Sequence, residues 1–178
     1  MNSLCAHVRL RLYVVLGSNV YAGKRNADCV LTFPPCVCGA ILQVCNGGRT
    51  YDTAVADGCS SITGDLDIDT IANTDLSGLS LLTAIGGNLE ILNNPNLVNL
   101  SGLDALTSIG GYLRIEYNPQ LTALTGLESL SGALPGYLRV TNCDVLSDIT
   151  AVGGFSSVGG LLYLSALPQL TSLTGLDG

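Results

Sequence analysis

Residues 85–121, IGGNLEILNNPNLVNLSGLDALTSIGGYLRIEYNPQL, contain nearly the same segment twice. The opening residues 85–91 return as residues 109–115, with leucine, isoleucine and glycine kept in place while the residues between them change. Positions that keep an aliphatic residue while their neighbours vary are expected in a core, and the varying positions are expected on the surface. This stretch therefore predicts a repeated unit with a shared apolar interior.

The repeat extends from Ile62 to the end of the chain. Aligned on glycine, the units begin at Gly64, Gly87, Gly111, Gly136 and Gly160, in steps of 23, 24, 25 and 24 residues. A period in the twenties is typical of a solenoid, in which each repeat forms one rung and buries its apolar edge against the next. We therefore predict a right-handed, leucine-rich-repeat-like β-solenoid of about five repeats of 23–25 residues over 62–178.

Each repeat begins with an alternation of apolar and variable residues, which predicts a strand with one buried face. The aliphatic pairs are Leu66/Ile68, Leu89/Ile91, Leu113/Ile115, Leu138/Val140 and Leu162/Leu164. Stacked rung on rung, these strands form a parallel sheet, so the predicted fold class is mainly β.

The path back to the next strand has its own period. Leucines stand at every third residue from Leu97 to Leu106, which favours a 3₁₀ or extended path over an α-helix. The Gly-Gly pairs at 86–87, 110–111 and 159–160 are expected at the corner before each strand, through positive φ or close backbone approach.

A turn follows each predicted strand. Asn94-Pro95 and Asn118-Pro119 occupy equivalent places, and Cys143 and Leu167 stand at the same offset in the next two repeats. Asn can bond neighbouring backbone and Pro stops the strand, and leucine-rich repeats use Asn or Cys here to satisfy buried backbone groups. We therefore expect Cys143 to be a buried free thiol rather than a nucleophile.

Composition and charge exclude several classes of function. With a net charge of −7 and only 7 Lys and Arg, the chain is not expected to bind nucleic acid. No apolar run approaches the roughly 20 residues that a membrane-spanning helix needs. The single histidine, His7, and the absence of a phosphate-binding G-x-x-x-x-G-K motif argue against an enzyme and against a cofactor.

The first 61 residues differ from the repeats. Residues 1–28 have Arg9 and Arg11 before a short apolar run, which predicts either a signal peptide or a disordered N-terminus. Residues 29–61 form a cysteine-rich segment and cap, with Cys29, Cys36, Cys38, Cys45 and Cys59. For Cys29, Cys36 and Cys38 we expect disulfides rather than a metal site, and their spacing does not determine their pairing.

The residues around the first repeat resemble a known family. The segment 59–68, CSSITGDLDI, matches the C-x-x-I-x-G-x-L-x-I first rung of the receptor L domains of the insulin and epidermal growth factor receptors. The L-x-x-I-G-G-x-L-x-I repeat is also similar to L-domain-like repeat proteins of microbes. The resemblance covers residues 45–178 and implies a short helix over the solenoid end, a Cys45–Cys59 disulfide and a secreted or cell-surface location.

The chain also departs from these receptors. Its rungs are more regular, and neither a membrane span nor a kinase accompanies them, so receptor signalling is not implied. The last residues, Leu176-Asp177-Gly178, end inside a repeat without a cap. We therefore expect a chain truncated at its C-terminus, with an open last rung that can self-associate.

In-register stacking turns the variable strand positions into columns, with about 4.8 Å between adjacent strands. One column reads Asp67, Glu90, Arg114, Arg139 and Tyr163, and its neighbour reads Asp65, Asn88, Tyr112, Tyr137 and Leu161. Because Tyr and Arg are favoured at binding hot spots, we expect Tyr112, Arg114, Tyr137, Arg139 and Tyr163 to contact a protein or glycan. The alternative is an ordinary solvated surface, on which Tyr112 stacks on Tyr137 and Glu116 balances Arg114.

Two further features complete the prediction. Asp65, Asp67 and Asp69 all point outward from one strand, whereas Ca²⁺ prefers oxygens converging from a curved loop, so no metal site is expected. Asn99-Leu100-Ser101 is an N-glycosylation sequon with Asn99 predicted at the surface. The sequence thus predicts an extracellular binding module, with a structural or adhesive surface repeat protein as the alternative.

Overall fold

The computed structural model describes residues 7–10, 13–16, 19–22, 27–30 and 42–176. The chain divides into two compact units, Met1–Leu42 and Gln43–Gly178. In the first unit β1 pairs with β4 and β2 with β3, both antiparallel. These strands are β1 (His7–Leu10), β2 (Tyr13–Leu16), β3 (Asn19–Ala22) and β4 (Ala27–Val30). The sequence analysis did not anticipate them, and removal of residues 1–28 as a signal peptide stays a prediction.

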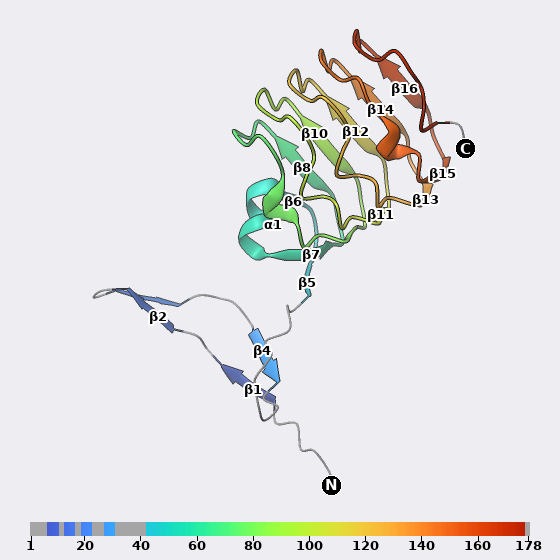
Figure 1. Cartoon of the computed structure of the whole chain (residues 1–178). Helices are drawn as coiled ribbons and strands as arrows, with labels where there is room; N and C mark the ends of the chain where they lie inside the picture. Colours follow the sequence, from blue (N-terminus) through green and yellow to red (C-terminus); the bar gives the residue numbers. More distant parts are fainter. Residues whose placement is uncertain (1–6, 11–12, 17–18, 23–26, 31–41, 177–178) are drawn as a thin grey trace. The chain divides into compact units, whose positions relative to one another are not determined.

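The second unit is the predicted parallel-strand solenoid. Its main sheet has the strand order β6-β8-β10-β12-β14-β16, and Figure 1 shows β8 to β16 side by side in chain order. The strands are β6 (Arg49–Thr50), β8 (Leu66–Asp69), β10 (Leu89–Leu92), β12 (Leu113–Glu116), β14 (Leu138–Thr141) and β16 (Leu162–Ser165). The five strands predicted from the aliphatic alternation are all present.

A second set of parallel strands lines another side of the rungs, in the orders β5-β7-β9-β11 and β13-β15. They are β5 (Gln43–Cys45), β7 (Cys59–Ile62), β9 (Ala84–Ile85), β11 (Ser108–Ile109), β13 (Gly132–Leu134) and β15 (Phe155–Val158). The rest of the return path is turns, with 3₁₀ helices at Ser77–Leu79 and Thr150–Val152. The predicted 3₁₀ or extended path is confirmed, whereas the second set of strands was not predicted.

The core lies between these sides, built from aliphatic residues in matching register. Leu89 pairs with Leu66 on one side and with Leu113 on the other. All three are 0% exposed, and Leu138 in the next strand is 1% exposed. The equivalent Leu162 of β16 is 46% exposed, so the last rung of the described chain is open.

The predicted asparagine ladder is confirmed. Asn94 and Asn118 are both 0% exposed. Asn94 Nδ2 donates to Ile68 O at 3.0 Å, and Asn118 Nδ2 donates to Ile91 O at 2.9 Å. Asn118 Oδ1 accepts from Asn94 N at 3.1 Å, which joins neighbouring rungs. Cys143, at the same offset, is a buried free thiol, as predicted.

The corner glycines are explained by close approach rather than by positive φ. A Cβ atom on Gly110 would collide with the carbonyl oxygen of Gly86, and one on Gly86 would collide with that of Thr63. Positive φ instead occurs directly after each strand, at non-glycine residues that the sequence analysis missed. These are Thr70, Asn93, Tyr117, Asn142 and Ala166, with φ between 53° and 56°.

A short helix covers the first rung. The helix α1 (Tyr51–Asp57) begins after the N-cap Thr50 and ends at Gly58, whose φ is 63°. Its buried residues are Tyr51 and Ala54, and α1 packs against β6 and β8. In the part of the chain that the structure describes, no helix is long and apolar enough to cross a membrane.

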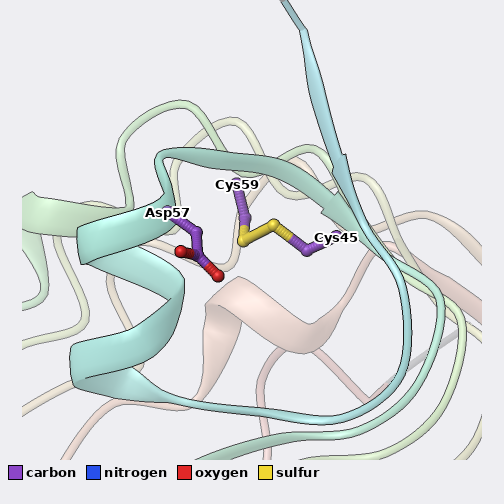
Figure 2. Close-up of side chains that lie close together, drawn as sticks. All are labelled: Cys45, Asp57 and Cys59. Carbon is purple, nitrogen blue, oxygen red and sulfur yellow. A yellow bond between two sulfur atoms is a disulfide. The ribbon is translucent and has the colours of Figure 1, made fainter. Parts of the chain in front are cut away.

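The Cys45–Cys59 disulfide joins β5 to β7 beside this helix, so the pairing implied by the family resemblance is confirmed (Figure 2). Both cysteines are 2% exposed. Cys29 lies in β4, whereas Cys36 and Cys38 lie outside the described residues.

Candidate ligand-binding face

The parallel register brings the predicted binding residues together. Arg114 of β12 pairs with Arg139 of β14, and Arg139 pairs with Tyr163 of β16. Tyr112 and Tyr137 precede β12 and β14 at equivalent positions. We call these five residues, Tyr112, Arg114, Tyr137, Arg139 and Tyr163, the Tyr–Arg patch.

The two tyrosines before the strands stack on each other. The ring centroids of Tyr112 and Tyr137 are 4.3 Å apart and their planes differ by 10°. The Tyr112 hydroxyl donates to Glu90 Oε1 at 2.5 Å. This hydrogen bond, followed by burial, raises the pKa of Tyr112. The stack fixes both rings in one orientation.

The two arginines share one carboxylate. Arg114 NH2 donates to Glu116 Oε2 at 2.7 Å, and Glu116 Oε1 forms an ion pair with Arg139 Nε. Arg114 NH1 also lies 3.6 Å from Glu90 Oε1. The Arg139 guanidinium lies over the Tyr163 ring, 5.1 Å from its centroid, which is cation–π geometry. One connected network therefore links β10, β12, β14 and β16.

The burial of Glu116 corrects the sequence analysis, in which Glu116 balances Arg114 on a solvated surface. The residue is only 2% exposed, and Thr141 beside it on β14 is equally buried. Arg114 hydrogen-bonds Glu116 Oε2, and Arg139 forms an ion pair with Glu116 Oε1, so the carboxylate is held out of water. Burial raises the pKa of Glu116, but the Arg114 hydrogen bond and the charges of both arginines outweigh burial and hold it below its usual value.

Two members of the patch are well exposed. The Arg139 side chain has 44% exposure and Tyr163 has 47%. Within the described residues, no hydrogen bond or ion pair engages the terminal amino groups of Arg139. Leu161, next to Tyr163, is 76% exposed. This end of the face therefore offers aromatic surface, apolar surface and free donors together.

The other end of the face is acidic. Asp67 of β8 pairs with Glu90 of β10, and Asp65 and Asp69 flank Asp67 on its own strand segment. Burial, then the neighbouring charges of Glu90, Asp65 and Asp69, raise the pKa of Asp67. The sheet face is thus polarised, with carboxylates over β8 and the Tyr–Arg patch over β12 to β16.

Asp65 has a structural role that the sequence analysis missed. Its Oδ1 accepts from Asn88 N at 2.7 Å, and Asn88 Oδ1 accepts from Tyr112 N at 3.0 Å. This is a second side-chain ladder, at the start of the strands, whereas the Asn94–Asn118 ladder follows their ends. The sequence does contain a signal for this ladder, because Asp65 and Asn88 are short hydrogen-bonding side chains at the same offset in two successive repeats.

The geometry does not favour a metal site. Of the described residues, only Cys45, Asp57 and Cys59 form a group of three Cys, His, Asp or Glu side chains whose ligand atoms lie within 4.8 Å of one another. Figure 2 shows the Asp57 carboxylate beside the disulfide. The two sulfurs are bonded to each other and provide no thiolate, and Asp57 pairs with Arg49 at 3.4 Å. The carboxylate oxygens of Asp65, Asp67 and Asp69 do not all lie within 4.8 Å of one another.

The sequon residue Asn99 lies between two buried residues, Leu97 and Leu100. Its Oδ1 accepts from Ser101 N at 3.0 Å, and the residue is partly exposed. Glycosylation of Asn99 stays a prediction.

Comparison with known proteins identifies a family. The model of the receptor L domain family matches residues 58–147, about half of the chain, which include β7 to β14. No curated protein and no solved structure matches the chain. Receptor L domains are non-enzymatic binding modules, typically of extracellular ectodomains.

Proposed function

The chain belongs to the receptor L domain family, and we propose that it is an extracellular or cell-surface module that binds a protein or a glycan through its parallel sheet face. The observation that carries the proposal is the network in the Tyr–Arg patch. It holds exposed tyrosine and arginine side chains in fixed positions on neighbouring strands.

Preorganisation is the physical advantage of this arrangement. A side chain that is ordered before binding loses less conformational entropy when a ligand arrives. Stacking orders the rings of Tyr112 and Tyr137, and the ion pair with buried Glu116 orders Arg139. Tyrosine and arginine anchors in fixed positions are typical of binding hot spots.

The proposal is tested by presenting the full chain to a displayed library of random 12-residue peptides and to a glycan array. Tyr163→Ala removes an exposed ring and is expected to weaken capture about tenfold, since truncating a hot spot costs more than about 1 kcal/mol. Thr125→Ala, an exposed change on the return path, is the matched control and should leave capture unchanged.

The role of the two arginines in binding must be tested with a variant that leaves no buried charge unpaired. Replacing Arg114 and Arg139 with alanine would leave the buried Glu116 carboxylate without its partners and would destabilise the fold. The charge-free variant Arg114→Gln/Glu116→Gln/Arg139→Gln avoids this problem and should also weaken capture. Capture that responds to neither Tyr163→Ala nor this variant would contradict the proposal.

A second candidate function is a structural or adhesive surface protein whose last rung associates with another copy. Leu162 is 46% exposed, and a cavity of about 130 Å³ beside it is lined by Leu138, Phe155 and Leu176. Exposed apolar surface next to a strand edge favours association. Sedimentation that shows a monomer at every concentration would exclude this candidate.

A further inference from the structure

The sheet face is acidic over β8 and carries the Tyr–Arg patch over β12 to β16, and this uneven charge restricts the class of ligand that it can bind. We propose that this face binds a polypeptide segment that places Lys or Arg over Asp67 and Asp69 and a carboxylate on the Arg139 fork. The inference rests on the proposed function, and it selects a protein ligand of mixed charge over a glycan.

The acidic half of the face lacks a cation. Asp67 is exposed, and within the described residues no ion pair joins Asp67 or Asp69 to Lys or Arg. Like charges in adjoining positions repel one another, and after burial the charges of Glu90, Asp65 and Asp69 raise the pKa of Asp67. A Lys or Arg side chain of a ligand would relieve this repulsion, so the acidic half is complementary to a basic segment.

The other half presents a guanidinium that is already oriented. Arg139 Nε faces the buried Glu116 carboxylate, and Tyr163 lies under the guanidinium plane. The two terminal amino groups remain free among the described residues. They match the two oxygens of a carboxylate, which arginine binds in a bidentate manner.

The separation of the two halves sets the spacing of the ligand charges. Strands β10 and β12 lie between β8 and β14, so the backbones at Asp67 and Arg139 are about 14 Å apart. An extended peptide covers this distance in about four residues. A ligand that satisfies both halves therefore carries opposite charges separated by about four residues.

Polypeptides meet this requirement better than glycans do. Most glycans are neutral or carry carboxylate and sulfate groups, and an acidic glycan would meet repulsion over Asp67 and Glu90. Only a ligand with both cations and carboxylates satisfies the two halves at once, and a peptide segment provides both.

The probe is a displayed library of random 12-residue peptides, selected against the immobilised full chain at 0.15 M salt. Enriched peptides should carry Lys or Arg about four residues from Asp or Glu. Asp67→Asn/Asp69→Asn should weaken their binding about fivefold or more, because both substitutions keep the shape and remove the charge. Raising the salt to about 0.5 M should weaken binding as well.

One variant is a control, and a second variant tests the arginine half of the face. Asp144→Asn removes an exposed carboxylate outside the sheet strands and should not change binding. Arg139→Gln should remove the preference for Asp or Glu among enriched peptides while the preference for Lys and Arg remains.

The outcomes separate this inference from the proposed function. Three results would overturn the inference. The enriched peptides could be neutral or purely acidic, their binding could be unchanged in Asp67→Asn/Asp69→Asn, or no peptide could be enriched at all. Capture of a glycan alone that is lost in Tyr163→Ala would also overturn it, but would leave the proposed function intact. Capture that no face variant weakens would overturn both.

Discussion

Glu116 carries a negative charge inside the sheet face, held there by Arg114 and Arg139. Burying a carboxylate costs several kcal/mol unless charged partners and hydrogen bonds replace water. The two arginines and the lowered pKa of Glu116 show that these partners outweigh the cost of burial. Both guanidinium positions in the patch depend on this one residue.

Glu116→Gln is expected to reduce the free energy of unfolding by about 1–3 kcal/mol at pH 7, because it removes the charge that both arginines face. The folded pKa of Glu116 lies below its unfolded value of about 4.3. The Glu116 carboxylate therefore makes its full contribution to the free energy of unfolding above the unfolded pKa. This contribution is lost as the pH falls through the folded pKa. Urea unfolding at pH 7 and at pH 3 measures the difference.

The matched control for Glu116 is Glu128→Gln. Glu128 is an exposed carboxylate that accepts from Gly126 N at 2.7 Å, and glutamine can keep that bond. We expect a change below about 0.5 kcal/mol at either pH. Equal effects of the two substitutions, or a Glu116→Gln effect that does not shrink in acid, would refute the role given to Glu116.

The strands β8, β10, β12, β14 and β16 of the main sheet are each followed by a residue with the same left-handed backbone conformation. Residues Thr70, Asn93, Tyr117, Asn142 and Ala166 all adopt positive φ. The turn brings the next residue inward, where Asn94, Asn118 and Cys143 are buried. Left-handed backbone is tolerated by Asn and costs more for a β-branched residue such as Thr70. The ladder and the strained turn are therefore parts of one element.

Thr70→Asn is expected to raise the free energy of unfolding by about 0.5–1 kcal/mol, because Thr70 has a φ of 54° and equivalent repeats use Asn at this place. Thr74→Asn, another exposed threonine without positive φ, is the control and should give no gain. Thermal unfolding of the three proteins provides the measurement. A loss of stability in Thr70→Asn would mean that the turn is not strained.

At the scale of the whole molecule, each rung contacts only its neighbours. The stability of a rung therefore depends on the rungs packed on either side of it. The N-terminal end is covered by α1 and fastened by the Cys45–Cys59 disulfide. At the other end of the described chain, Leu162 of β16 is exposed. The cap therefore protects one end of the stack, and the first rung depends on it.

Removing the disulfide should destabilise the solenoid. The two cysteines are 14 residues apart, and closing a loop of this size contributes about 3 kcal/mol in the chain-entropy model. Cys45→Ala/Cys59→Ala should therefore unfold at lower urea, with the loss followed by tyrosine fluorescence. Under reducing conditions the variant and the parent should differ much less. A variant as stable as the oxidised parent would contradict this assignment.

The Tyr–Arg patch was only partly predictable. Tyr112, Arg114, Tyr137, Arg139 and Tyr163 could be placed on one face because in-register parallel strands keep equivalent positions in columns. The Tyr112–Tyr137 stack was foreseen as the alternative to a binding role, and it forms. The burial of Glu116 was not predictable from strand alternation, which treats every outward position alike.

The sequence by itself determined the solenoid, its parallel register, the Asn94–Asn118 ladder and the aliphatic core, because each repeats at a fixed period and repetition reports burial. The Cys45–Cys59 pairing followed from the family resemblance. Only the tertiary structure decided the positive φ after each strand, the Asp65–Asn88 ladder and the charge network around Glu116. The network depends on contacts between side chains of different rungs, the ladder depends on how a side chain meets the backbone of the next rung, and the positive φ depends on backbone geometry. A repeat length shows which positions are equivalent, but it does not fix these distances and angles.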